Sequence, residues 1–291
     1  MNTVGFIGLG AMGGRIADRI LDAGHRVYAT NRTKAKARPL IERGPQWRES
    51  PREVAAAGDV VLSMVTDDEA LEAITAGPRG LLAGLKAGQV YVDMSTVSPQ
   101  ASRRLAERVR ARGADMLDAP VSGSVPQAEN GTLAIMVGGQ GEAFSFVEPL
   151  LHEFGRSVTH VGPNGQGLVV KLAINISLAV QTLAFSEGLV LAERAGVDPK
   201  IAAEVMSTSS IGSPMLKARV PLLLDLPEHP WFDVALMEKD IRLARKAADE
   251  LQLTLPSAAV ADEMLIRASE LGYAHRDLAA LHDVLAKSPA A

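Results

Sequence analysis

The segment GFIGLGAMGG, residues 5–14, constrains the fold more than any other part of this chain. It follows a short apolar, β-branched run and precedes a segment whose apolar residues recur at helical spacing. Gly8, Gly10 and Gly13 form the pattern G-x-G-x-x-G, which between a strand and a helix is the fingerprint of a dinucleotide-binding unit. We therefore predict a dinucleotide site built from this loop, which comprises Gly8, Leu9, Gly10, Ala11, Met12 and Gly13.

The three glycines have different predicted roles. Gly8 permits the tight turn, and Gly10 lets the backbone approach a pyrophosphate that the helix N-terminus attracts. Gly13 allows the helix to pack closely on the sheet. The alternative is a glycine-rich turn without a ligand, which the strand before it and the helix after it make less favourable.

The first 160 or so residues alternate between strand-like and helix-like segments, which is typical of a parallel sheet with crossover helices. After GPNGQG the strand signals stop, and the chain is predicted to be helical to its end, with breaks at GVDPK, SSIGSP and DLPEHPWF. We predict an α/β architecture with a Rossmann-type doubly wound NADP-binding domain at 1–162 and an all-α domain at 163–291 that begins with a long interdomain helix. The expected strands are 4–9, 26–31, 60–66, 90–95, 114–121 and 132–139.

Composition excludes several classes of function. The chain has 291 residues, a formal net charge of -4 and no cysteine. The absence of cysteine rules out disulfides, thiolate nucleophiles and Cys-ligated metal, and no metal is expected. Without a block of basic residues, neither nucleic acid nor an anionic membrane surface is an expected partner. The N-terminal residues lack the features of a signal peptide, so a cytoplasmic location is expected.

The apolar run from Gly167 to Phe185 has the length of a membrane span. Lys171 and Asn175 lie near its middle, and the helical pattern continues beyond it with Glu187. These polar residues favour a buried helix of a soluble protein. Because the helix is apolar all round, we expect it to pack between domains or subunits, which favours a homodimer or homotetramer.

Lys171 and Asn175 are four residues apart and therefore share one face of this helix. Burial of an ammonium group is costly and lowers its pKa toward neutrality, as a general acid or base requires. The alternative is a lysine that reaches solvent from the helix start and an asparagine that bonds to a neighbouring helix.

The second expected strand ends in Asn31-Arg32-Thr33, where NAD-binding proteins usually carry an acidic residue. A carboxylate there would repel a 2'-phosphate, whereas Arg32 can bind one through charge-assisted hydrogen bonds. NADP(H) is therefore the predicted cofactor and NAD(H) the alternative; in the alternative reading Arg32 only solvates a helix start.

Three further segments are candidates for ligand contacts. The ends of the third and fourth expected strands place Met64 and Val65 near the adenosine side of a dinucleotide and Thr96 near its nicotinamide, although turn chemistry explains each equally well. The loop DAPVSGSVPQAENGTL offers hydroxyls and free amides for a small carboxylate-bearing substrate, or it is a simple turn. These loop residues are Ser122, Gly123 and Ser124.

Taken together, the motifs resemble those of the β-hydroxyacid dehydrogenase family over almost the whole length. GFIGLGAMG resembles the cofactor fingerprint of that family and DAPVSG...GTL its substrate loop. GPNGQGLVVKLAIN resembles its catalytic pattern G-x-G-x-x-x-K-x-x-x-N, and the KD of MEKDIRLA resembles its C-terminal cofactor motif.

The resemblance implies an enzyme that interconverts a small β-hydroxyacid and its semialdehyde, or a related short aldehyde acid. Lys171 would be the general acid and base, and Asn175 would orient the substrate. Ser122, Gly123 and Ser124 would hold the substrate carboxylate. The resemblance also implies that Thr96 and Lys239 contact the cofactor and that Asp240 supports Lys239.

One departure concerns the substrate loop, where many members read SGG and this chain has Ser124 in place of the second glycine. The departure leaves the substrate open. Two other functions are considered: an imine reductase, which usually has another residue at the lysine position, and a non-catalytic NADP-binding module, which tends to lose the lysine.

Overall fold

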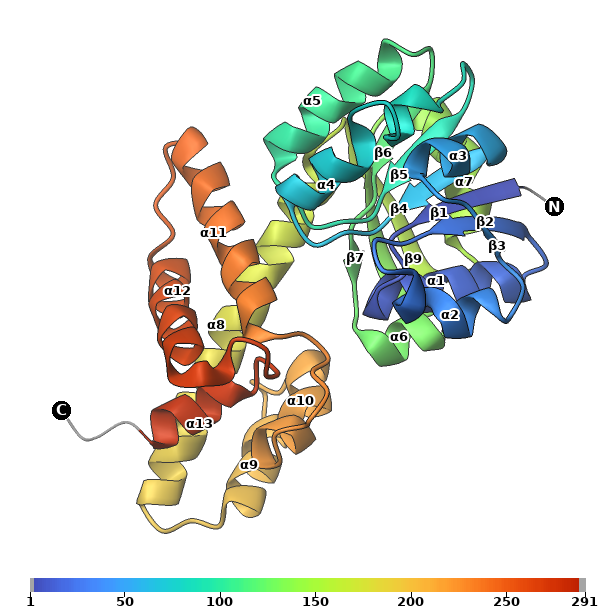
Figure 1. Ribbon diagram of the computed structural model, residues 1–291. Helices are drawn as coiled ribbons and strands as arrows, with labels where there is room; N and C mark the ends of the chain where they lie inside the picture. The colour runs from blue at the N-terminus through green and yellow to red at the C-terminus, as the bar shows by residue number, and fades with distance from the viewer. Residues whose placement is uncertain (1–2, 288–291) are drawn as a thin grey trace. The chain divides into compact units, whose positions relative to one another are not determined.

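The computed structural model describes residues 3–287, and the chain divides into two compact units, Met1–Lys171 and Leu172–Ala291 (Figure 1). The first unit contains the sheet and the second is helical (Figure 1). The predicted fold class is therefore confirmed: an α/β unit, a long helix and a helical C-terminal region.

Within residues 3–287 the first unit forms one nine-stranded sheet in the order β3-β2-β1-β4-β5-β6-β8-β7, with β9 beside β8. The pairs from β3 to β6 are parallel, whereas β8 runs antiparallel to β6 and β7 and parallel to β9. The strands are β1 (Thr3–Ile7), β2 (Arg26–Thr30), β3 (Gln46–Trp47), β4 (Val60–Ser63), β5 (Val90–Asp93), β6 (Asp115–Asp118), β7 (Val121–Ser122), β8 (Leu133–Gly138) and β9 (Gly155–Gly162).

The sheet differs from the predicted one in three ways. It is mixed rather than parallel throughout, because the chain turns back after β6. The strand expected at 114–121 is split at Pro120, which has no N–H to donate to a ladder. The strands β3 and β9 were not predicted, since β3 has two residues and β9 carries mostly polar, exposed side chains.

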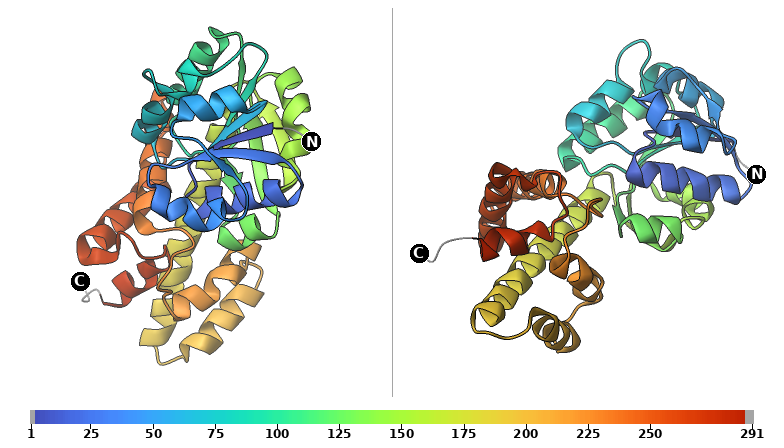
Figure 2. Two further views of the ribbon diagram at one scale, coloured as in Figure 1. Left: turned by 45° about the vertical axis from the view of Figure 1, so that its right-hand side comes forward. Right: turned by 60° about the horizontal axis from the view of Figure 1, so that its bottom comes forward.

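Helices cover both faces of this sheet (Figure 2). Successive residues of a strand point to opposite faces, so Phe6 and Ile7 of β1 enter two separate hydrophobic clusters, as do Leu62 and Val61 of β4. This double-sided core is what a doubly wound sheet requires. The helices of this unit are α1 (Ala11–Asp22), α2 (Lys34–Ile41), α3 (Pro51–Ala57), α4 (Asp68–Thr75), the 3₁₀ turn η1 (Leu81–Ala83), α5 (Pro99–Arg110), α6 (Val125–Glu129) and α7 (Gly141–Leu151).

The second unit consists of helices, and three of the breaks between them fall where the sequence predicted them. Two further breaks, at 251–255 and 274–279, were not predicted. Side chains at the breaks cap the helices that follow: Asp198 accepts from Lys200 N at 2.8 Å, and Ser213 accepts from Leu216 N at 3.2 Å. The helices are α8 (Gln166–Arg194), which begins in the first unit, α9 (Pro199–Thr208), α10 (Pro214–Leu224), α11 (Val234–Glu250), α12 (Pro256–Ala268), the π-helical turn η2 (Ser269–Tyr273) and α13 (Ala280–Ala286).

Helix α8 is the one described helix that is long and apolar enough, by length and composition alone, to cross a membrane. Its side chains nevertheless enter three separate hydrophobic clusters of the second unit, through Ala179 and Leu183, through Phe185, and through Leu189. Asn175, Thr182 and Ser186 on the same helix are fully buried. These features are those of a helix that packs within a protein core.

A buried ion pair holds the segment before α11. Arg219 Nη1 lies 3.0 Å from Asp277 Oδ1, and these side chains are 6% and 0% exposed. Asp277 also accepts hydrogen bonds from the backbone N–H groups of Trp231 (2.8 Å), Phe232 (3.2 Å) and Ala279 (3.0 Å). Phe232 is partly buried and packs against the core of the second unit.

Candidate active site

The fingerprint loop joins β1 to α1 and uses its three glycines differently. Gly8 has φ +96°, and a Cβ on it would lie 2.2 Å from Met64 O. A Cβ on Gly13 would lie 2.1 Å from Gly8 O, whereas a Cβ on Gly10 would meet no described atom within 4 Å. Gly8 and Gly13 are therefore required by packing, and Gly10 borders open space. Because α1 begins at Ala11 without a side-chain cap or an acidic residue in its first turn, its N-terminus suits a phosphate.

Asn31 braces this loop. Leu9 N donates to Asn31 Oδ1 at 3.1 Å, and Asn31 Nδ2 donates to Thr33 O at 3.0 Å. Thr33 is the N-cap residue of α2, although its side chain makes no capping hydrogen bond. Asn31 thus fixes the shape of the loop whether or not it also contacts a cofactor.

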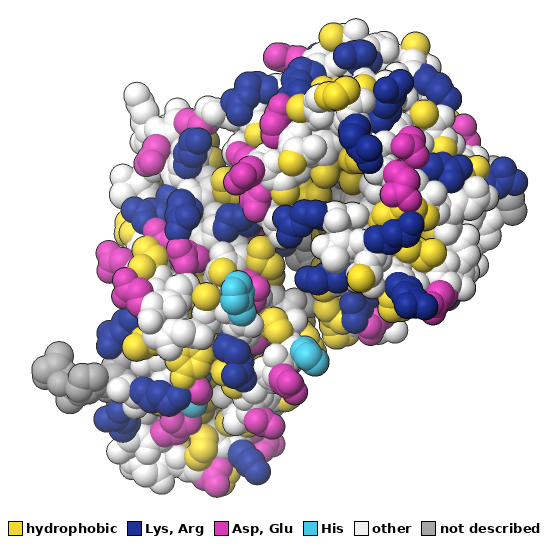
Figure 3. Space-filling model, viewed as in Figure 1, with side chains coloured by type: hydrophobic (Ala, Val, Ile, Leu, Met, Phe, Trp, Pro, Cys, Tyr) yellow, Lys and Arg dark blue, Asp and Glu magenta, His cyan; other side chains and the backbone are white. Residues whose placement is uncertain are grey.

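Positive charge gathers at the carboxyl end of β2. Arg32 is exposed and has no hydrogen-bond or ion-pair partner within residues 3–287. The neighbouring strand β3 leads into Arg48, whose guanidinium lies 4.2 Å from the centroid of the Tyr28 ring. Figure 3 shows Lys and Arg side chains over the region of α2 and β3. Arg48 was not predicted, since its place beside β2 depends on the two-residue strand β3.

Glu49, an acidic residue that follows β3, is already paired. Glu49 Oε1 lies 3.2 Å from Lys34 Nζ and accepts from Trp47 Nε1 at 2.8 Å. The hydrogen bond from Lys34 lowers the pKa of Glu49, so this carboxylate stays ionised and engaged with its lysine. The side chains at the end of β2 therefore keep a net positive charge.

Hydrogen bonds connect the loop that follows β4 with the loop that follows β5. Val65 N donates to Ser95 Oγ at 2.9 Å, and Ser95 Oγ donates to Asp93 Oδ1 at 2.6 Å. Burial raises the pKa of Asp93. Met64 and Val65 are half-buried, and Thr96 is half-buried within an otherwise buried segment. These three predicted residues therefore lie on one braced edge of the sheet.

The substrate loop begins with β7 and continues into α6. Ser122 pairs with Ala134 of β8. Gly123 has φ +125°, and a Cβ on it would lie 2.8 Å from Leu133 Cδ2, so no other residue fits. Ser124 is the N-cap residue of α6, in a capping box in which Ser124 N donates to Gln127 Oε1 at 2.9 Å. The serine that departs from the SGG pattern therefore has a local structural role.

The turn GPNGQG leads from β9 into α8. Gly162 and Gly165 have φ +134° and +90°, backbone conformations that favour glycine. A Cβ on Gly167 would lie 2.5 Å from Met136 O, so α8 begins in close contact with the sheet. Lys171 follows Leu168 by three residues in α8 and is half-buried.

Asn175, one turn after Lys171, is fully buried and bonded to α11. Its Nδ2 donates to Asp240 Oδ2 at 2.6 Å, and Asp240 Oδ1 lies 2.8 Å from Lys239 Nζ. Within residues 3–287 Asn175 Oδ1 has no hydrogen-bond partner. A hydrogen bond from Asn175 to a neighbouring helix is the alternative that the sequence left open, and α11 is that helix. The partner Asp240 was not predicted; its sequence signal is an acidic residue within the buried row of α11 formed by Met237 and Ile241.

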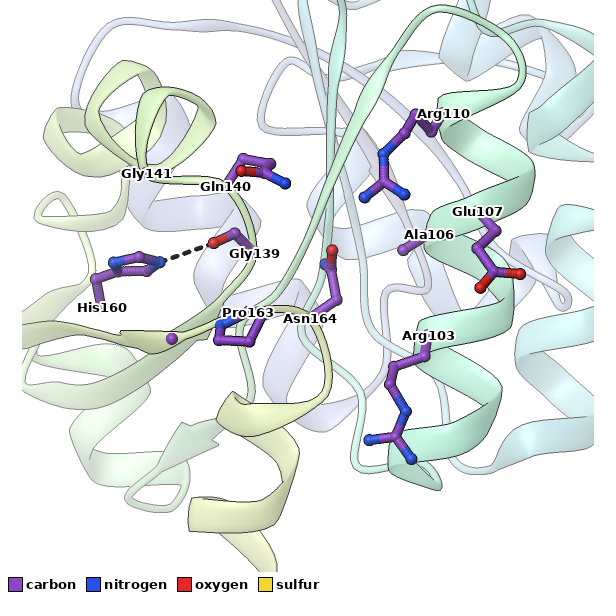
Figure 4. A pocket seen from close by; sticks show the side chains of 11 residues that line it. Arg103, Ala106, Glu107, Arg110, Gly139, Gln140, Gly141, His160, Pro163 and Asn164 are labelled. Atoms are coloured by element: carbon purple, nitrogen blue, oxygen red, sulfur yellow. Dashed lines mark hydrogen bonds between the residues drawn. The ribbon is translucent and has the colours of Figure 1, made fainter.

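A pocket of about 470 Å³ lies elsewhere on the first unit, beside α5 and the start of α7 (Figure 4). His160 Nε2 is hydrogen-bonded to Gly139 O at 2.8 Å on one of its sides. This pocket contains none of the residues predicted to bind cofactor or substrate. The lining residues are Arg103, Ala106, Glu107, Arg110, Gly139, Gln140, Gly141, His160, Gly162, Pro163 and Asn164.

Comparison with known proteins assigns the family. Residues 3–162 match the NAD binding domain of 6-phosphogluconate dehydrogenase, and residues 165–285 match the NAD-binding domain of NADP-dependent 3-hydroxyisobutyrate dehydrogenase. The chain is 36% identical over 282 residues to 2-hydroxy-3-oxopropionate reductase of Escherichia coli, covering 97% of this chain and 96% of that protein. The chain belongs to the β-hydroxyacid dehydrogenase family.

Two solved structures of similar proteins agree with this assignment. One is a 3-hydroxyisobutyrate dehydrogenase of Mycobacterium tuberculosis with L-serine, which has a TM-score of 0.86 and 29% identity over 98% of this chain and 99% of that one. The other, Psf3 in complex with NADP+ and 2-OPP, has a TM-score of 0.90 and 29% identity over 97% and 99%. The predicted enzyme class is confirmed: this β-hydroxyacid dehydrogenase is an NAD(P)-dependent oxidoreductase of β-hydroxyacids and their semialdehydes.

Proposed function

We propose that this β-hydroxyacid dehydrogenase uses NADP(H) to interconvert a short β-hydroxyacid and its semialdehyde, or a related short aldehyde acid, with Lys171 as general acid and base. The observation that carries the proposal is the direct attachment of the first turn of α8, one turn before Lys171, to β6, the strand that leads into the substrate loop. The similar proteins are named for 2-hydroxy-3-oxopropionate and 3-hydroxyisobutyrate, which are both small carboxylic acids.

Each proposed residue has its own part in the reaction. A bound nicotinamide supplies or accepts the hydride. Lys171 donates a proton to the carbonyl oxygen during reduction and takes it back during oxidation. Ser122, Gly123 and Ser124 bind the substrate carboxylate, and Asn175 orients the substrate. On the cofactor side we propose contacts from Gly8, Leu9, Gly10, Ala11, Met12, Gly13, Asn31, Arg32, Thr33, Met64, Val65, Thr96 and Lys239.

The residues of the fingerprint loop fit a dinucleotide. The space beside Gly10 is free of described atoms, and the N-terminus of α1 has neither a side-chain cap nor an acidic neighbour in its first turn. Both features favour a pyrophosphate group.

We propose that the two domains correspond to residues 1–162 and 163–291.

A turnover panel tests this function. Short semialdehydes, their hydroxyacids and cyclic imines are assayed with NADPH or NADP+ and with the NAD pair. We expect turnover of at least one semialdehyde with NADPH. Turnover of imines alone would indicate an imine reductase, and tight NADPH binding without turnover of any compound would indicate a non-catalytic module; either result would overturn the proposal.

Arg32 is expected to set the preference for NADP(H). A guanidinium bonded to a phosphate contributes about 1.5–3 kcal/mol, which is roughly a 10- to 100-fold change in affinity. We therefore expect Arg32→Gln to lower kcat/KM with NADPH by that factor and to leave kcat/KM with NADH nearly unchanged. Steady-state kinetics with both cofactors measure the effect.

Arg38→Gln provides the matched control, because Arg38 is on the same helix–turn segment but already pairs with Glu42 at 3.0 Å. It should keep the wild-type ratio of NADPH to NADH efficiency. An equal loss with both cofactors in Arg32→Gln would contradict recognition of a 2'-phosphate.

We also propose that the protein is a cytoplasmic homodimer or homotetramer. Large apolar side chains are exposed on the second unit, among them Leu191 (73%), Ile201 (58%), Val205 (62%) and Ile211 (62%). Exposed apolar groups in such number favour association between subunits. Sedimentation velocity of the full chain gives the oligomer size, and a monomer at micromolar concentration would refute this part of the proposal.

A further inference from the structure

Asp118 is a fully buried carboxylate at the carboxyl end of β6, and the reaction outlined above does not use it. Its Oδ1 accepts a hydrogen bond from Gly165 N at 2.6 Å, and its Oδ2 accepts one from Leu168 N at 3.2 Å. These N–H groups belong to the turn before α8 and to its first turn, where backbone donors have no partner within the helix. Asp118 therefore caps α8 from a neighbouring strand.

Two glycines lie close against Asp118. A Cβ on Gly138 would lie 2.7 Å from Asp118 Oδ2, and a Cβ on Gly167 would lie 2.9 Å from the same atom. Asn164 adds a second tie, since its Nδ2 donates to Met116 O at 2.8 Å. Two glycines and three hydrogen bonds, made by the side chains of Asp118 and Asn164, thus fix the start of α8 against β6.

This attachment bears on both halves of the proposed chemistry. Three residues beyond Asp118, β7 begins and leads into Ser122 and Gly123. Lys171 is three residues beyond Leu168 and therefore lies on the same side of the helix one turn later. One carboxylate connects the strand that leads into the substrate loop with the helical turn that precedes the lysine.

We propose that Asp118 is a positioning residue that sets the place of Lys171 relative to the substrate loop. The inference rests on the function proposed above. A displacement of about 1 Å between reacting groups can lower a rate by about 100-fold. Loss of the carboxylate should therefore lower kcat more than it raises KM.

Few charged groups face Asp118. From β5, Asp93 is its partner in the strand register, and the charge on Asp93 raises the pKa of Asp118 further. From α5, the Arg103 guanidinium lies beside Gly165. Burial is the main cause that raises the pKa of Asp118, to about 6, while the hydrogen bonds from Gly165 and Leu168 lower it.

Asp118→Asn is the first test, with Asp115→Asn as its control because Asp115 is an exposed residue of the same strand. The amide keeps the size of the side chain but presents N–H groups to a backbone donor. We expect kcat to fall by about 10- to 100-fold, with KM within threefold and unchanged NADPH affinity. Asp115→Asn should match the wild type in all three.

The pH profile distinguishes positioning from a general loss of structure. In the wild type, kcat should fall as the pH drops through about 6, because protonation of Asp118 replaces an acceptor with a donor. Asp118→Asn should have a low kcat without this acid limb. A wild-type kcat in folded Asp118→Asn, or a lowered kcat that keeps the acid limb, would overturn the inference.

Asp118→Glu is the second variant, and it tests the inference if the asparagine variant does not fold. It keeps the carboxylate but lengthens a fully buried side chain that two glycines approach closely, so we expect a lowered kcat with the acid limb retained. Wild-type kcat in folded Asp118→Glu would overturn the inference. If the wild type itself turns over no compound of the panel, the proposed function fails instead, and the two failures are thereby distinguished.

Discussion

Replacement of Lys171 by alanine is expected to abolish most turnover while NADPH binding persists. A positioned general acid contributes about 10²- to 10⁴-fold to a rate, which is about 3–5 kcal/mol of transition-state stabilisation. We expect kcat to fall by this factor in Lys171→Ala, because no other cation is proposed to protonate the carbonyl oxygen. Single-turnover kinetics with a semialdehyde from the panel measure the chemical step directly.

Two comparisons make this result specific. Lys200→Ala removes an exposed lysine of the second unit and should have wild-type kinetics. A small primary amine added to Lys171→Ala should restore part of the lost rate, since it can replace the missing proton donor. Wild-type turnover in Lys171→Ala would refute the assignment, and a loss of NADPH affinity equal to the loss of rate would point to a role in cofactor binding.

Replacement of Asp277 by alanine is expected to cause the largest loss of stability. Asp277 is fully buried, pairs with Arg219 at 3.0 Å and accepts backbone hydrogen bonds from residues 231, 232 and 279. Breaking a buried ion pair by removing one partner costs about 3–5 kcal/mol, because the other charge remains buried without compensation. Denaturant unfolding of Asp277→Ala and the wild type measures the difference in free energy of unfolding.

Asp249→Ala is the control, since Asp249 is exposed in the same unit. Its free energy of unfolding should lie within about 0.5 kcal/mol of the wild type. The double variant Arg219→Met, Asp277→Leu should recover part of the stability lost in Asp277→Ala, because it leaves no unpaired buried charge. A loss below about 1 kcal/mol in Asp277→Ala would show that the ion pair adds little to the fold.

A smaller effect is expected from pH. The pKa of Asp118 is about 6 in the folded protein, against an ordinary 3.8. Between these values the folded state binds more protons than the unfolded state, so the free energy of unfolding falls as the pH rises from about 4 to about 6. The loss is about 3 kcal/mol, and the raised pKa of Asp93 acts in the same direction. Unfolding at several pH values should show this slope, and Asp118→Asn should reduce it.

The sequence predicted the fold wherever local patterns determine it. The strands β1, β2, β4, β5 and β8 were predicted with somewhat longer bounds because their buried, β-branched residues form distinct runs. The direction of β8 was not predictable from such runs, since antiparallel pairing with β6 depends on where the chain returns. The strand β9 was missed because its exposed polar residues resemble a loop, although six of its residues pair with β8.

The candidate site, like the fold, was predicted where spacing or motif order determines it and not where contacts between distant segments do. Spacing brought Lys171 and Asn175 to one helix face, and motif order suggested the loops. Contacts between distant segments were not visible in the sequence: Asp240 lies 65 residues from Asn175, and Asp118 lies 47 residues from Gly165. Both are acidic residues in buried rows, and the pattern alone does not say which partner neutralises or bonds to them.

The capping role of Ser124 has a consequence for altering the selectivity of this enzyme. Since the side chain of Ser124 belongs to the start of α6, a Ser124→Gly change made to imitate the SGG relatives would loosen a helix as well as remove a hydroxyl. Its effect on substrate choice would be mixed with an effect on loop order. Redesign of this loop therefore needs to exchange the residues from Ser124 to Gln127 together.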